Sequence, residues 1–323
     1  MNKYVYKNSV SLFIALVLAF FSCKNEEILK CDILIKNGVI YDGTGKNSYN
    51  GVVAIESDKI VYVGPSKKIE ADSIIDVNGM AIAPGFINML SWGYNSLLDD
   101  GRGLSDLIQG VTLEVFGEGI SPGPRGSKSN NTYISFKDAM EKLEKKGVST
   151  NIASYLGAAS VRIQVMGYKN KKANHEELKK MGQIVEEAMQ DGAIGIGSSL
   201  IYAPGDYADT EELIALCKVA AKYDGRYISH MRNEDNEIMA ALDELMKIAK
   251  EANIPAEIYH LKASRKANWH LLDSVINRVE RARAEGYKIT ADMYTYRASS
   301  TGLTGVIPTW VQEGGHRAWI NRM

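Results

Sequence analysis

The sequence has few cysteines, no surplus of either charge and no nucleotide-binding fingerprint, and each shortage excludes a class of protein. Cys31 and Cys217 fit neither a disulfide framework nor the spacing of a zinc or redox motif. The 38 basic and 39 acidic residues are spread through the chain, so we expect no nucleic-acid partner. No glycine-rich turn follows a strand and opens a helix, as a nucleotide site requires.

Long apolar runs are also missing, except near the start of the chain. Lys3 and Lys7 precede an apolar run over residues 10–21, which has the length of a secretory signal's hydrophobic core. Ser22 and Cys23 follow the run, in a sequence that resembles a loose bacterial lipoprotein signal. We therefore predict a signal peptide over 1–23, lipidation of Cys23, and a secreted, membrane-anchored lipoprotein of the periplasm or cell envelope. An ordinary cleaved signal with an incidental cysteine is the alternative.

The rest of the chain predicts two parts. Residues 32–82 alternate apolar and polar residues, and Asn37-Gly38 is typical of a hairpin turn, so this part is expected to be a small antiparallel β unit. Residues 83–323 alternate strands with long helical stretches, which predicts parallel βα units. About seven strands are expected, one fewer than a closed barrel needs: 85–90, 110–117, 149–156, 193–198, 226–230, 256–260 and 287–293.

Two histidines stand at equivalent places in this pattern. His230 and His260 each follow a short apolar run and precede a helical stretch, and they lie about thirty residues apart. That spacing is close to one strand-plus-helix unit, so both side chains are expected at the carboxyl ends of neighbouring strands. A buried, hydrogen-bonded histidine is the alternative for each, but two at matching places favour metal binding. His175, His270 and His316 are not predicted ligands.

Several short segments together carry a family resemblance: Ala83 to Ile87, Gly110 to Thr112, Gly195 to Gly197 before Tyr202 to Pro204, Ser229 to Glu234, His260 to Ala263, Ala291 to Tyr296, and Trp310 to Gly315. In this order and spacing they resemble the N-acyl-D-amino-acid deacylases, or D-aminoacylases, of the amidohydrolase superfamily. The resemblance implies a metal-dependent (β/α)8 TIM-like barrel, here incomplete, with a small N-terminal β-sandwich portion over 32–82. It also implies a hydrolase that acts on carbon–nitrogen bonds other than peptide bonds, in N-acylated D-amino acids.

The chain departs from the family pattern on the first two barrel strands. The family usually has an aspartate and a His-x-His pair on the first strand, where this chain has Asn88, Leu90 and Trp92. On the second strand the family commonly has a cysteine ligand, and Glu118 occupies that position. A carboxylate with two histidines is a familiar zinc set, so the predicted metal site is Glu118, His230 and His260. Manganese or iron would accept similar donors, and a loop-capping role is the alternative for Glu118.

Three further residues are predicted to bind the substrate carboxylate. Lys262, two residues past His260, and Tyr294 are favoured by position and by the resemblance. Arg232 is the third candidate, because guanidinium groups bind carboxylates in bidentate fashion. Surface or loop positions are the alternative for all three.

Hydrolysis of an amide needs an activated water and a base. A divalent metal can activate the water and polarise the carbonyl, and a base must still move the proton to the leaving amine. The resemblance places that base on an eighth strand, expected beyond Met323, while Asp292 matches a different family aspartate. Two hypotheses follow: a zinc-dependent deacylase, or a truncated, non-catalytic pseudoenzyme or small-molecule-binding lipoprotein.

Overall fold

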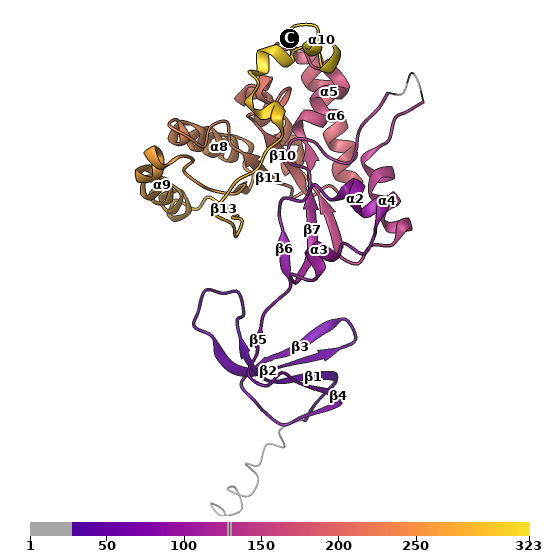
Figure 1. The fold of residues 1–323 in the computed structure, drawn as a ribbon, viewed down its shortest axis with the longest axis vertical. Coiled ribbons are helices and arrows are strands. Elements are labelled where there is room, and N and C mark those ends of the chain that lie inside the picture. The colour runs from indigo at the N-terminus through magenta and orange to yellow at the C-terminus, as the bar shows by residue number, and fades with distance from the viewer. Residues whose placement is uncertain (1–27, 128, 130) are drawn as a thin grey trace, which may run out of the picture. The chain divides into compact units, whose positions relative to one another are not determined.

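The computed structural model of the chain describes residues 28–127, 129 and 131–323 (Figure 1). The predicted signal peptide and Cys23 lie outside these residues. The chain divides after Pro84 into two compact units, and the sequence analysis placed this division between residues 82 and 83. No helix of the described part is both long and apolar enough to cross a membrane.

The first unit is a single five-stranded sheet. Its strands are β1 (Leu29–Ile40), β2 (Tyr49–Glu56), β3 (Lys59–Gly64), β4 (Ile69–Asp76) and β5 (Ala81–Ile82). The order is β3-β2-β1-β4, and β5 also pairs with β1. β1 runs antiparallel to β2 but parallel to β4 and β5, so the sheet is mixed, which corrects the antiparallel prediction. One sheet is one layer of the β-sandwich that the resemblance implied.

The predicted hairpin at Asn37-Gly38 is also wrong. β1 continues through both residues, and its register with β2 shifts between Ile35 and Gly38. Asn37 has a φ of 60°. A left-handed residue suits a bulge as well as a tight turn, and only the pairing of β1 with β2 selects the bulge.

The second unit contains all of the predicted barrel strands. They are β6 (Phe86–Asn88), β7 (Val111–Phe116), β8 (Asn151–Ser154), β9 (Leu156–Gly157), β10 (Gly195–Ser199), β11 (Arg226–His230), β12 (Ala256–Ile258) and β13 (Ile289–Ala291). β8 and β9 are separated by Tyr155 alone, so they count as one strand. All pairs are parallel, in the order β6-β7-β8 and β9-β10-β11-β12-β13. The prediction of seven parallel strands is confirmed, and among the described residues β6 and β13 do not pair with each other.

Helices follow most of these strands (Figure 1). They are α2 (Tyr94–Asp99), α3 (Leu104–Leu107), α4 (Phe136–Lys146), α5 (Ala158–Met166), α6 (His175–Gln190), α7 (Thr210–Ala221), α8 (Ile238–Ala252), α9 (Leu272–Ala284) and α10 (His316–Ile320), with 3-10 turns η2 (Gly205–Tyr207), η3 (Lys266–Leu271), η4 (Leu303–Val306) and η5 (Thr309–Gln312). Capping boxes begin two of the long helices: Ser135 with Asp138 at α4, and Asn174 with Glu177 at α6. These caps satisfy amide groups that a helix start leaves unpaired.

The strand alternation separates a helix-covered face from an inner face. In β11, Tyr227 belongs to the large core formed with the helices, whereas Ile228 packs with Val115, Tyr155 and Tyr259. Successive side chains on a strand point to opposite faces, so His230 lies on the same inner face as Ile228. Polar residues at the carboxyl ends of the strands therefore meet above the inner core.

Candidate metal centre

Three potential metal ligands converge from three different strand ends. Glu118 follows β7, His230 ends β11 and His260 follows β12. One donor atom of each lies within 4.8 Å of the others. Glu118 Oε1 is 2.8 Å from His230 Nδ1 and 3.7 Å from His260 Nε2. The structure thus brings together the three residues predicted as ligands, although they are up to 142 positions apart in the sequence.

The loop that carries Glu118 is shaped by two glycines and a tryptophan. Gly117 and Gly119 have φ values of 110° and 68°, and a Cβ on Gly117 would lie 2.3 Å from the carbonyl oxygen of Tyr155. Only glycine fits such a close approach with this backbone. Trp92 Nε1 donates a 2.9 Å hydrogen bond to Glu118 Oε2. The resemblance implied a histidine ligand at the position of Trp92, where the indole instead contacts the candidate ligand Glu118.

His260 reaches the inner face because the chain bends after β12. Ile258 pairs with Ser229, so the next residue, Tyr259, points inward like His230. Strict alternation would then turn His260 outward. However, β12 ends at Ile258 and His260 has a φ of 38°, a left-handed conformation that is uncommon outside glycine. Because of this bend, Tyr259 and His260 both face the interior, and strained backbone of this kind is frequent at functional sites.

The charged groups of the centre stabilise one another. Burial raises the pKa of Glu118, but hydrogen bonds with His230 and His260 outweigh it and lower the pKa to about 2. Burial lowers the pKa of His260, yet its contacts with Glu118 and Glu234 raise it to about 9. Glu234 has a pKa below its usual range, since contacts with both histidines and with Lys262 overcome the effect of burial. The acids are thus held ionised, and the metal-free centre attracts positive charge.

A divalent cation fits this donor set. Three carboxyl groups, Glu118, Glu234 and Asp292, lie around one ammonium, Lys262, so the acidic groups of the cluster outnumber its lysine. His230 Nε2 is buried without a hydrogen-bond partner. Two imidazoles and a carboxylate are the donors that zinc uses in catalytic sites, where a fourth position stays open. The residues present therefore fit zinc.

The two favoured substrate residues lie beside the centre. Lys262 Nζ is 2.7 Å from Glu234 Oε2 and donates a 3.1 Å hydrogen bond to the carbonyl oxygen of His260. The same ammonium lies 5.7 Å from the ring centroid of Tyr294, and that ring is 6.4 Å from the ring of His260. Their binding of a carboxylate remains a prediction, now with the expected proximity.

Arg232 has different surroundings from those the sequence suggested. Its guanidinium donates to both carboxylate oxygens of Glu244 at 2.9 Å and to the carbonyl oxygens of Asp206 and Ala208. These partners belong to α8 and to the segment around η2, so Arg232 joins the loop after β11 to the surrounding structure. Arg232 lies beyond the end of β11 at His230, so the alternation of side chains along that strand does not decide where Arg232 points.

Two further residues at the centre were missed by the sequence analysis. Ser199 pairs in register with His230, so its side chain faces the inner side, and its buried hydroxyl has no hydrogen-bond partner. Glu234 contacts both histidines and Lys262. The four-residue spacing from His230 was the signal available for Glu234. Asp292 accepts a 2.7 Å hydrogen bond from the backbone N–H of His260, while its second oxygen is buried and unpaired.

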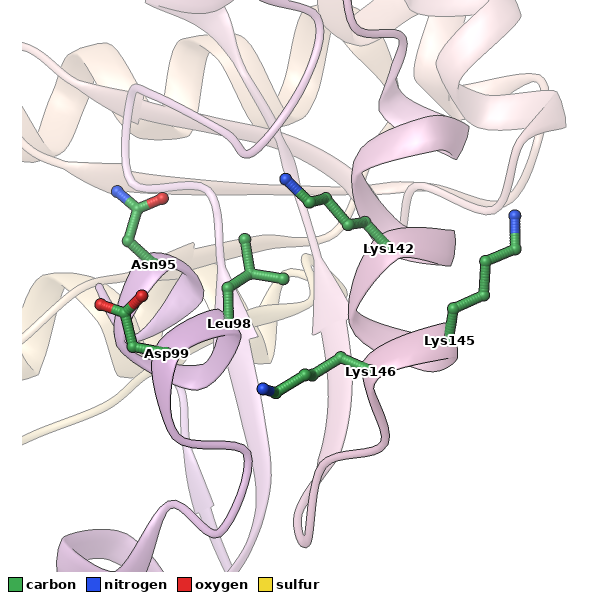
Figure 2. A pocket seen from close by; sticks show the side chains of 6 residues that line it. All are labelled: Asn95, Leu98, Asp99, Lys142, Lys145 and Lys146. Carbon is green, nitrogen blue, oxygen red and sulfur yellow. The ribbon is translucent and has the colours of Figure 1, made fainter.

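Two cavities of the second unit lie next to α2, and neither is lined by a member of the ligand trio. One, of about 620 Å³, is lined by Asn95, Leu98 and Asp99 of α2 and by lysines of α4, of which Lys142 and Lys146 extend toward α2 (Figure 2). A second, of about 590 Å³, is lined in part by Trp92 and Glu114. The Glu114 carboxylate accepts hydrogen bonds from Ser91 and Thr150, which gives it a structural role.

Comparison with known proteins gives a consistent group of relatives, although no protein-family model matches. The D-aminoacylase of Alcaligenes xylosoxydans xylosoxydans is 31% identical over 285 residues, which are 84% of this chain and 59% of that protein. A crystal structure of D-aminoacylase, described as defining a novel subset of amidohydrolases, has a TM-score of 0.74 at 30% identity, over 82% of this chain and 59% of that one.

A third relative was solved with ligands. The N-acyl-D-glutamate deacylase of Bordetella bronchiseptica, complexed with zinc and a phosphonate mimic of the tetrahedral intermediate, has a TM-score of 0.73 at 26% identity, over 83% of this chain and 59% of that one. The chain thus spans about three fifths of the length of these relatives. With the parallel strands and the ligand trio, these likenesses establish that the chain is homologous to the D-aminoacylases and N-acyl-D-glutamate deacylases of the amidohydrolase superfamily.

Proposed function

We propose that this protein is a zinc-dependent amidohydrolase that hydrolyses the amide bond of N-acyl-D-amino acids. The observation that carries the proposal is the convergence of Glu118, His230 and His260 within 4.8 Å at the inner ends of three strands. The homologues are named as D-aminoacylase and as an N-acyl-D-glutamate deacylase that was solved with zinc. Both lines support the same reaction class.

The residues of the centre have complementary tasks in this reaction. Zinc held by Glu118, His230 and His260 would supply a Lewis acid and a water of lowered pKa. Trp92 fixes the second oxygen of Glu118 and so leaves Oε1 toward the histidines. Lys262 and Tyr294 would bind the carboxylate of the substrate, since the Lys262 side chain is only one fifth exposed and its ammonium lies 5.7 Å from the Tyr294 ring centroid. The carboxylate would place the scissile amide next to the ligand trio.

The test measures zinc content and turnover together. Purified protein, dialysed and then assayed by mass spectrometry of metals, is expected to retain one zinc per chain. Release of free amino acid from N-acetyl-D-amino acids should exceed release from the L-enantiomers. Glu118→Gln and His230→Asn should lose zinc and turnover, whereas His270→Asn, an exposed histidine outside the centre, should lose neither. Zinc retention unaffected by both ligand variants would refute the proposed site.

A metal-dependent binding protein without turnover is the second candidate. It is favoured by one observation. Of the carboxylates at the centre within the described residues, only Asp292 has an oxygen without a hydrogen-bond partner, so only Asp292 has an oxygen free to act as a general base. A general base typically contributes 10²-fold to 10⁴-fold to the rate. Zinc-dependent binding of an N-acetyl-D-amino acid with no release of product would select this candidate over the deacylase.

We further propose that the protein is exported and anchored to a membrane through a lipid on Cys23. The support is the basic start, the apolar run over residues 10–21 and the Ser22-Cys23 pair that follows it. Expression in a bacterial host with radiolabelled palmitate should label the parent protein, and Cys23→Ser should abolish the label. Cys31→Ser is the matched control, because Cys31 is buried in the first sheet. Unlabelled parent protein in the soluble fraction would contradict the anchor.

A further inference from the structure

Glu234 joins two functional side chains of the candidate centre. Its Oε1 is 2.9 Å from His260 Nδ1, and its Oε2 is 2.7 Å from Lys262 Nζ. The same carboxylate lies 3.7 Å from His230 Nε2. The side chain is 12% exposed, so these contacts form in a largely dehydrated environment.

The loop holds Glu234 in this position through its backbone. The carbonyl oxygen of Glu234 accepts a 2.7 Å hydrogen bond from the backbone N–H of Ser264, in the loop that also carries Lys262. Asn233 Oδ1 accepts hydrogen bonds from the N–H groups of Asp235 and Glu237 on the other side. The loops after β11 and β12 are therefore fastened together at Glu234, and its carboxylate is preorganised.

The position of Glu234 decides which nitrogen of His260 is free for a metal. Lys262 Nζ lies 3.0 Å from His260 Nδ1. If Lys262 donated to that nitrogen, the neutral ring would carry its proton on Nε2, and Nε2 would not bind a metal. A carboxylate at Nδ1 favours the opposite tautomer, in which Nδ1–H donates to Glu234 and the Nε2 lone pair faces Glu118, 3.7 Å away.

We propose that Glu234 is a positioning residue with two effects. It fixes the metal-binding tautomer of His260, and it bonds to the Lys262 ammonium, which would otherwise donate to His260 Nδ1. The inference rests on the proposed function, because it presumes that His260 binds a metal. Outer carboxylates of this kind raise metal affinity by about 10-fold to 100-fold. Lys262 keeps one donor for a substrate carboxylate after bonding to Glu234 and to the His260 carbonyl oxygen.

The test compares zinc affinities of the full chain by competition with a chromophoric chelator. Glu234→Ala is expected to weaken zinc binding by about 10-fold to 100-fold. Glu234→Gln should lose less, because its amide oxygen can still accept from Nδ1. The matched control is Glu237→Gln, an exposed acid in the same loop, which should bind zinc like the parent.

A double variant distinguishes the tautomer-fixing role of Glu234 from a merely structural role. In Glu234→Ala, Lys262 is free to donate to His260 Nδ1, so adding Lys262→Met should recover much of the lost zinc affinity. If the losses simply add, the tautomer explanation is wrong. Zinc affinity within twofold of the parent in both Glu234 variants would also overturn the inference.

Cobalt separates a positioning residue from a direct ligand. The visible absorption of bound Co²⁺ depends on its ligands, so it should keep its shape in Glu234→Gln at saturating metal. A changed spectrum would make Glu234 a ligand and refute the positioning role, while leaving the proposed function intact. A parent protein that binds neither metal would instead refute the proposed function, and with it this inference.

Discussion

The most exacting prediction concerns a buried ion pair far from the metal centre. Arg162 of α5 and Glu212 of α7 are 0% and 2% exposed, and Arg162 Nη1 lies 2.5 Å from Glu212 Oε2. Arg162 Nη2 also donates to the carbonyl oxygens of Lys169 and Lys171. One guanidinium therefore connects α5, α7 and the segment before α6. The perturbation is Arg162→Met, which keeps the apolar volume and removes the charge.

The expected cost has two parts. Removing one partner of a buried ion pair typically destabilises a protein by about 3–5 kcal/mol, because the remaining charge is uncompensated. Part of this cost comes from the two carbonyl oxygens that lose their donor, and that part does not depend on pH. The other part comes from the ionised Glu212 carboxylate and does depend on pH.

The pKa of Glu212 gives the sign of that dependence. Burial raises it to about 7, although the charge of Arg162 opposes the shift. Loss of Arg162 removes the opposing charge and raises the pKa further. A carboxyl group with a raised folded-state pKa contributes stability at low pH that is lost as the pH rises through that value. Above pH 7 the variant keeps losing stability relative to the parent, by at most about 1.4 kcal/mol per pH unit.

Urea unfolding at pH 5 and pH 8.5, followed by tryptophan fluorescence, measures both parts. All four tryptophans, Trp92, Trp269, Trp310 and Trp319, belong to the second unit, as does the ion pair. The variant should be less stable than the parent at both pH values, and the difference should be larger at pH 8.5. The double variant Arg162→Met/Glu212→Leu should recover most of the loss. An equal difference at both pH values would refute the assignment of the cost to an ionised Glu212.

Three other predictions concern the metal, a helix cap and a glycine. Zinc at about 100 times its dissociation constant should stabilise the fold by about 2.7 kcal/mol, seen as a higher Tm that a chelator reverses; an unchanged Tm would argue against the site. Asn174→Ala removes the cap of α6 and should cost about 1 kcal/mol in urea, whereas the exposed Glu176→Gln should cost far less. Gly197→Ala places a Cβ 2.1 Å from the carbonyl oxygen of Gly117 and should lower the Tm markedly. Gly182→Ala in α6, whose Cβ would lie 3.6 Å from the nearest side-chain atom, should raise the Tm. An unchanged Tm in Gly197→Ala would contradict the close approach.

The seven strands and their helices were predictable because their signals are local. A parallel strand that is covered on both faces needs a short apolar run, and an amphipathic helix needs apolar residues every three to four positions. The ends of the strands were predicted less accurately. The strand predicted over 256–260 ends at Ile258, and the apolar pattern gives no sign of the left-handed backbone at His260. His230 was placed correctly at the end of its strand.

The candidate ligands were also within reach of the sequence, since two histidines one βα unit apart must approach each other in a parallel sheet. Their partners were not. Trp92 donates to Glu118 from 26 positions away, and Arg232 is held by Glu244 on α8 rather than left free for a substrate. A side chain's hydrogen-bond partners depend on which loops the fold brings together, and no local pattern contains that information.

The sequence by itself determined the order of strands and helices, the family resemblance and the identity of three candidate ligands, because periodicity and motif spacing are properties of neighbouring residues. Only the tertiary structure decided that β1 carries a bulge instead of a hairpin, that His260 turns inward and that Glu234 bridges His260 and Lys262. Each of these depends on pairing between distant segments, where the free energy of a contact is set by geometry in three dimensions.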